Sequence, residues 1–99
     1  MMVSGEASSS TDPSAFAPTV QYLVGALLRA KAAPSAPEAE RIIQDTIREL
    51  GLGPGAPADV KEFVRICEGL KRRGGLTEFV ATMTRVAAEL YQARQAAKR

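Results

Sequence analysis

Apolar residues recur in four stretches of the chain, at intervals of three or four positions. These intervals follow the 3.6-residue period of an α-helix and give each stretch one apolar face. The chain shows neither the strict alternation of a half-buried strand nor a hairpin signal of the Asn-Gly kind. The pattern therefore predicts an all-α fold with four helices, over residues 18–32, 36–50, 57–73 and 77–96.

The second helix has the clearest end signals. Ser35 and Glu38 match a capping box, in which each side chain binds a free backbone amide at the start of the helix. Gly51 supplies the left-handed residue that closes many helices, and Leu52 is placed to fold back on Ile47. These residues predict a helix that begins directly after Ser35 and ends at position 50.

The other three helices are bounded by prolines, glycines and a polar cap. We expect Pro18 and Pro57 in first turns, where the missing amide proton costs little. Gly74 and Gly75 should stop the third helix, and Thr77 should cap the fourth. The connections that remain are short, so successive helices are expected to pack as antiparallel neighbours in a four-helix bundle.

The large apolar residues of the four helices are expected to form one core. In the last helix, Leu76, Met83 and Leu90 occupy equivalent heptad positions. That spacing suits a member of an antiparallel bundle and a seam that faces a partner equally well. The predicted core consists of Phe16, Leu23, Leu27, Ile43, Ile47, Phe63, Val64, Cys67, Phe79, Met83, Val86 and Leu90.

Residues 1–12 are rich in Ser and Gly and have no apolar period, so a disordered tail is expected before a helical domain over residues 13–99. No apolar stretch approaches the ~20 residues that a membrane-spanning helix needs. The first residues also lack the basic start and apolar run of a secretory signal. The sequence therefore favours a cytoplasmic protein without a membrane span.

The composition argues against catalysis. The chain has no histidine and a single cysteine, Cys67. It therefore lacks a Ser-His or Cys-His nucleophile pair and the common zinc ligand sets. Cys67 lies within the apolar face of the third helix, where a buried hydrophobic role is expected. Neighbouring carboxylates, such as Asp45 and Glu49, fall on solvated helix faces beside arginines. We expect no enzyme activity, no cofactor, no metal and no small-molecule substrate.

Residues at the margins of the apolar faces favour a protein–protein interaction module, such as an adaptor, regulator or small subunit. Ile66 and Tyr91 fall outside the stripes that the core needs, and Arg65, Arg72 and Arg94 accompany them on the third and fourth helices. Aromatic and arginine side chains often dominate interface energy. We therefore expect a partner protein or a second copy of the chain to bind these five residues. The alternative is that Ile66 and Tyr91 form only the outer wall of the bundle.

The charge distribution supports a second hypothesis, nucleic-acid binding. Residues 51–99 carry nine basic and five acidic side chains, a balance of +4, whereas residues 1–50 carry four basic and six acidic ones, a balance of −2. Basic residues gather at 71–73 and near the C-terminus, and a non-specific binder needs several such contacts to phosphate. Cations in a last helical turn also complement the helix dipole, which accounts for residues 71–73 without a ligand.

Overall fold

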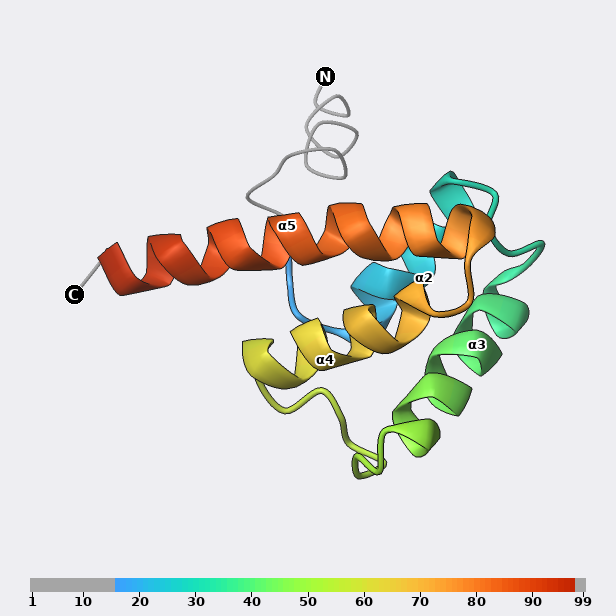
Figure 1. Cartoon of the computed structure of the whole chain (residues 1–99), viewed down its shortest axis with the longest axis horizontal. Coiled ribbons are helices and arrows are strands. Elements are labelled where there is room, and N and C mark those ends of the chain that lie inside the picture. Colours follow the sequence, from blue (N-terminus) through green and yellow to red (C-terminus); the bar gives the residue numbers. More distant parts are fainter. Residues whose placement is uncertain (1–15, 98–99) are drawn as a thin grey trace, which may run out of the picture.

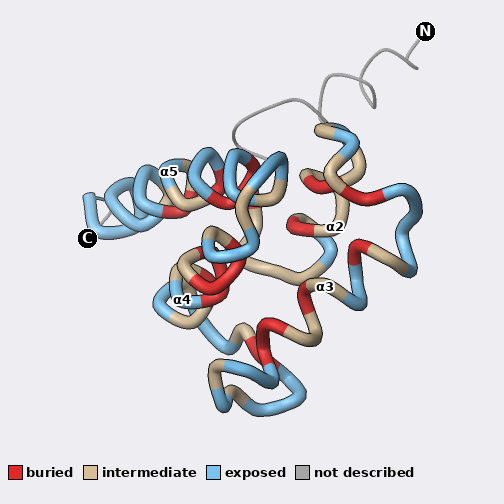
Figure 2. The backbone as a smooth tube through the Cα atoms, turned by 45° about the vertical axis from the view of Figure 1, so that its right-hand side comes forward, coloured by how far each residue is buried: buried red, intermediate tan, exposed pale blue. Residues whose placement is uncertain are grey.

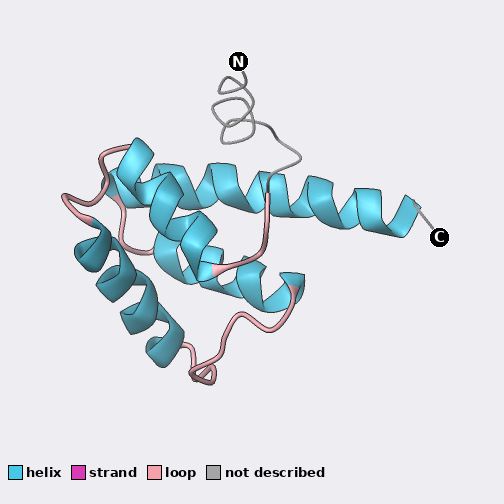
Figure 3. Cartoon of the chain, turned by 180° about the vertical axis from the view of Figure 1, so that it is seen from behind, coloured by secondary structure: helices cyan, strands magenta, loops and turns pink. Residues whose placement is uncertain are grey.

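The computed structural model describes residues 16–97 and confirms the all-α prediction for them. These residues form only helices and loops (Figure 3). The tail expected over residues 1–12 lies outside the described part of the chain. Figure 1 shows the four helices, α2 (Val20–Arg29), α3 (Ala36–Glu49), α4 (Val60–Lys71) and α5 (Gly75–Ala97).

Three of the helices begin at a polar cap. Thr19, Ser35 and Asp59 have extended backbones, and each side-chain oxygen accepts a hydrogen bond from the amide three residues later. Such a bond satisfies one of the four amides that a helix start leaves free. These caps correct two predicted starts, because Pro18 and Pro57 precede the caps instead of lying in the first turns.

Two helices end in a residue with left-handed backbone geometry. In α3, Gly51 has φ 75°, and the Leu52 amide bonds the Ile47 carbonyl at 3.1 Å, as the sequence predicted. In α2, Lys31 takes the same role with φ 59°. A non-glycine residue rarely adopts this conformation. The sequence therefore gave no sign of it, and α2 ends at Arg29 instead of the predicted position 32.

The connection between α4 and α5 is three residues long and depends on glycine. Gly74 and Gly75 have φ values of 74° and 60°, which side chains with a β-carbon rarely tolerate. The amide of Glu78 bonds the carbonyl of Gly74 at 3.2 Å, so the last helix is already formed there. Thr77 therefore lies inside the first turn, and the prediction that it caps the helix was wrong.

The helices pack as two pairs. α4 and α5 form an antiparallel hairpin with the most extensive contact in the molecule, and α2 packs on α3. Contacts of α3 with α4 and of α2 with α5 join the pairs. α3 is inclined to the hairpin and does not lie alongside it (Figure 1). Ten residues, 50–59, connect α3 to α4 and allow this change of direction.

The core lies where α4 meets the other three helices (Figure 2). Phe16, which precedes α2, packs its ring against Phe63 of α4 and Tyr91 of α5, with centroid separations of 5.3 and 5.2 Å. The largest fully buried side chains are Phe63, Leu23, Leu27, Ile43, Ile47, Ile66, Leu70, Thr46 and Cys67. The prediction that Phe79, Met83, Val86 and Leu90 belong to this core was wrong, because all four are exposed.

The approach of α4 to α3 requires a glycine at position 69. A β-carbon there would lie 2.7 Å from the methyl carbon of Thr46. Thr46 is only 1% exposed, and its hydroxyl donates a hydrogen bond to the Ile42 carbonyl at 2.9 Å. Its side chain is therefore held in place and cannot easily give way.

We predict that Gly69→Ala lowers the free energy of unfolding by about 1–2 kcal/mol, because the cost of overpacking exceeds the gain in helix propensity. Urea denaturation measures this change. Gly53→Ala is the matched control, since nothing lies within 4 Å of a β-carbon at position 53. Equal stability of the two variants would contradict the close contact between α3 and α4.

Cys67 is fully buried, and burial, with a smaller contribution from the Glu68 carboxylate, raises the pKa of its thiol from 9.0 to about 12. At pH 8 a disulfide reagent should therefore label the native protein at least about a hundredfold more slowly than the denatured chain, because the thiolate is the reactive form. Absorbance of the released thiol follows the reaction. Similar rates in buffer and in denaturant would show that Cys67 is accessible.

Candidate functional site

Large apolar side chains line the outer side of α5. Their exposed fractions lie between 47% and 60%, although residues of this kind are usually buried. Their spacing alternates between three and four residues, so they form one continuous row along the helix. We call this row the α5 stripe, and it consists of Leu76, Phe79, Met83, Val86 and Leu90.

A different face of α5 packs on the rest of the protein. Its buried residues are mostly small, namely Val80, Ala81, Thr84 and Ala88. Small side chains let two helix backbones approach closely, and the larger residues of α4 fill the space between the two helices. The Thr84 hydroxyl donates to the carbonyl of Val80 at 2.7 Å, so no unpaired hydroxyl faces the core. Helix geometry places the α5 stripe roughly a third of a turn from this face.

Ion pairs hold α5 to α4 on the side away from the stripe. The guanidinium of Arg85 lies 2.7 Å from the Glu68 carboxylate of α4 and 3.2 Å from that of Glu89 on its own helix. All three side chains are partly exposed, so each pair contributes little stability. The Arg85–Glu68 pair nevertheless joins the two helices of the hairpin on this side of α5.

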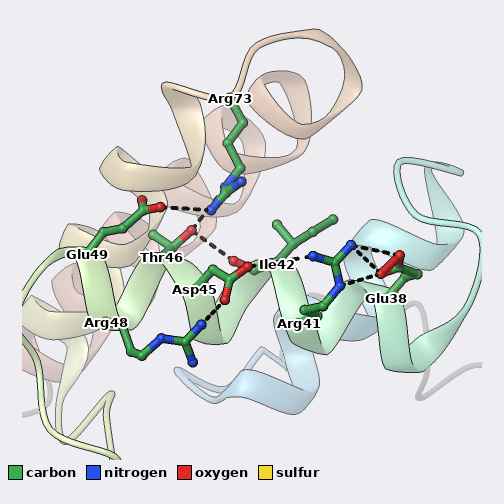
Figure 4. Close-up of polar contacts among 8 residues, drawn as sticks. All are labelled: Glu38, Arg41, Ile42, Asp45, Thr46, Arg48, Glu49 and Arg73. Carbon is green, nitrogen blue, oxygen red and sulfur yellow. Dashed lines mark hydrogen bonds and ion pairs between the residues drawn. The ribbon is translucent and has the colours of Figure 1, made fainter.

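A polar network fixes the joint between α4 and α5 to α3 (Figure 4). Arg73 donates to the Thr46 hydroxyl at 3.2 Å, and its guanidinium lies 3.5 Å from the Glu49 carboxylate. On the exposed side of α3, Arg41 pairs with Glu38 at 2.6 Å. Arg73 belongs to the basic cluster at 71–73, and the structure gives it a structural role.

Two of the five residues predicted to bind a partner pack within the fold. Ile66 is 0% exposed and packs in the core, which corrects the expectation that it lies outside the core stripe. Tyr91 is half-buried, and its ring packs against Phe16. The alternative, that they form the outer wall of the bundle, describes Tyr91, whereas Ile66 lies deeper, in the core itself. A surface contact through Ile66 would require the helices to separate.

The three predicted arginines are exposed but do not form one cluster. Arg65 lies on α4, Arg72 lies at its C-terminal cap, and Arg94 lies on α5. Arg94 is one turn beyond Leu90 and therefore continues the side of α5 that carries the stripe. Arg94 is thus the one predicted arginine that shares a helix face with the exposed apolar row.

The C-terminal turns of α5 extend past the N-terminal end of α4, since the two helices are antiparallel (Figures 1 and 3). Residues 92–97 are exposed around the whole circumference of the helix. The stripe therefore runs along the body of the protein and ends where the helix projects from it. The flank of the stripe at Thr82 and Glu89 and its C-terminal end are exposed, whereas Val80 on the other flank packs on the domain.

Two further findings concern the described residues only. Among residues 16–97, no three His, Cys, Asp or Glu side chains are grouped so that they could hold a metal ion. No helix in this range has the length and apolar character that crossing a membrane requires. The described residues thus offer the α5 stripe, and not a polar cluster, as the candidate site.

No protein-family model, curated protein or solved structure matches this chain. The candidate site therefore rests on the residues and contacts described above.

Because Ile66 is buried and Met83 is exposed, truncating the two side chains should change the free energy of unfolding by very different amounts. Ile66→Ala should lower the free energy of unfolding by about 2–5 kcal/mol, because it leaves a cavity in the core. Met83→Ala should change it by less than about 0.5 kcal/mol, because its side chain is 55% exposed. Thermal and urea melts at low protein concentration measure both. A large loss for Met83→Ala would place the stripe in the folded core.

Proposed function

We propose that this chain is a non-catalytic protein–protein interaction module that binds its partner through the α4–α5 hairpin, with the α5 stripe as the contact surface. The exposed row of five large apolar side chains carries this proposal. Together they present about 500 Å² of apolar surface, at the upper end of what single soluble chains expose. A cytoplasmic location is part of the same proposal.

The form of the stripe also supports a helical partner. A row with alternating three- and four-residue spacing is narrow and straight, and it matches the apolar edge of another amphipathic helix. Phe79 and Met83 lie next to each other in its centre, and such residues often provide the largest share of binding energy. A role as adaptor, regulator or small subunit fits this surface.

The alternative, nucleic-acid binding through the basic half, has weaker support. Arg73 binds Thr46 and Glu49, and Arg85 pairs with two carboxylates. Each internal pair reduces the positive charge that is available to phosphate groups, on which non-specific affinity depends. The remaining exposed arginines lie apart on α4 and α5, and no observation favours this function over the first.

Photo-crosslinking in the native cell tests the proposed function. We expect benzoylphenylalanine at position 79 to capture a protein, because Phe79 is 59% exposed in the middle of the stripe. The same group at position 92 is the matched control, since Gln92 is exposed on another side of α5. Immunoblotting and mass spectrometry identify the adducts.

A second variant checks that capture depends on the stripe. Leu90→Glu should abolish the adduct formed from position 79, because it places a charge in the apolar contact. Gln92→Glu, which adds the same charge two residues away, should leave it intact. Capture that is equal from positions 79 and 92, or that survives Leu90→Glu, would contradict the proposed function.

A further inference from the structure

The chemistry of the α5 stripe also indicates what it binds. We propose that its partner is a second copy of this chain, and that the two α5 helices pair in parallel as a two-stranded coiled coil. This inference rests on the proposed function, because it assumes that the stripe is a contact surface. It assigns the partner, the symmetry and the register.

The spacing of the stripe is that of a heptad repeat. Leu76, Met83 and Leu90 stand at position a, and Phe79 and Val86 stand at position d. Ala93 follows at the next d position on the projecting end of the helix. A helix with apolar residues at a and d buries them against an equivalent helix, because a shallow supercoil keeps both rows in contact. The stripe is therefore complementary to itself.

The area of the stripe agrees with a dimer. Each chain would bury about 500 Å² of apolar surface from the stripe, and a stable interface buries roughly 800 Å² on each partner. Of the flanking e and g positions, Thr82, Glu89 and Arg94 are exposed and can add to this area, whereas Val80 is only 4% exposed and already packs on the domain. Two copies of the stripe thus give an interface at the low end of the usual size range, whereas one exposed stripe leaves all of this surface in water.

Charge complementarity selects the parallel orientation. In a parallel coiled coil, position g of one helix faces position e of the next heptad on the other, five residues later. Glu89 stands at g and Arg94 at e, and both are exposed. Glu89 would therefore meet Arg94 of the partner subunit, and symmetry creates this pair twice. An antiparallel pairing brings g beside g, which leaves Glu89 next to Thr82 of the partner subunit without an opposite charge.

The body of the protein leaves room for the second helix. The face of α5 that packs on the domain is formed by Val80, Ala81, Thr84 and Ala88, and its centre lies roughly a third of a turn from the stripe. A partner helix can therefore approach without displacing α4. The two remaining e positions beside the stripe, Val80 and Ala87, are small and uncharged, so no charge is buried at the seam.

Sedimentation equilibrium of the full chain tests the dimer. We expect a dimer that dissociates at least about a hundredfold more readily when Met83→Glu and Leu90→Glu are combined, since both place charges at position a. The Gln92→Glu variant should remain dimeric, and circular dichroism should show that all variants keep their helix content. A wild-type chain that stays monomeric up to about 1 mM would overturn self-association.

A cysteine at position 93 tests the orientation. In a Cys67→Ala background, Ala93→Cys should form an intermolecular disulfide rapidly, because equivalent d positions face each other only in the parallel arrangement. The Cys67→Ala chain alone is the control and should form none. A dimer in which Ala93→Cys does not crosslink would overturn the parallel register.

Charge reversal tests the register independently. Glu89→Arg should weaken the dimer about tenfold by placing like charges beside each other, and adding Arg94→Glu should restore it. A double variant as weak as Glu89→Arg alone would contradict the pairing of these residues. Both side chains are exposed, so Glu89→Arg costs the folded chain at most the weak ion pair of Glu89 with Arg85.

The two proposals fail in different ways. If the chain is monomeric, yet position 79 still captures a different protein in a stripe-dependent manner, self-association is wrong and the proposed function stands. If the chain is monomeric and position 79 captures nothing, both are wrong. A captured species with twice the mass of the chain, lost with Leu90→Glu, supports both.

Discussion

The structure depends on the close contact between α4 and α5. α4 provides large side chains, among them Phe63, Ile66 and Leu70, and α5 meets them with alanines and threonine. Because the inner face of α5 is filled mostly by small residues and Tyr91, the helix does not need the five residues of the stripe for packing. Those side chains point outward instead. The composition of one helix face thus determines both how the hairpin packs and what the protein exposes.

Two further contacts position this hairpin on the rest of the chain. Phe16 joins α4 and α5 through the rings of Phe63 and Tyr91, at the side where α2 begins. At the opposite end of α4, Arg73 connects the joint to Thr46 and Glu49 of α3. The hairpin is therefore held near both ends, which fixes the direction in which α5 projects. A rigid orientation reduces the conformational entropy that α5 itself would lose if another helix docked on it.

The sequence predicts the number and type of the helices, because the 3.6-residue period and the end signals are local. The end of α2 could not be predicted, since the left-handed conformation of Lys31 has no local signal. The orientation of α5 was predicted wrongly for a different reason. This helix has two apolar faces, and larger residues usually form the core. Only the tertiary fit of Ala81 and Ala88 against α4 identifies the inner face. The same misassignment made Tyr91 a candidate for the surface. Ile66 was placed at the margin of the apolar stripe of α4, although the other helices bury that side of α4 as well.

The separation of the two faces of α5 has a consequence for how such a protein can change over generations. Substitutions in Leu76, Phe79 or Val86 alter the exposed row while the packing of the domain stays the same. Substitutions in Ala81 or Ala88 do the reverse. Selection can therefore act on this surface and on folding almost independently. A duplicated copy of the chain needs only a few changes along one row of α5 to present a different surface on the same fold.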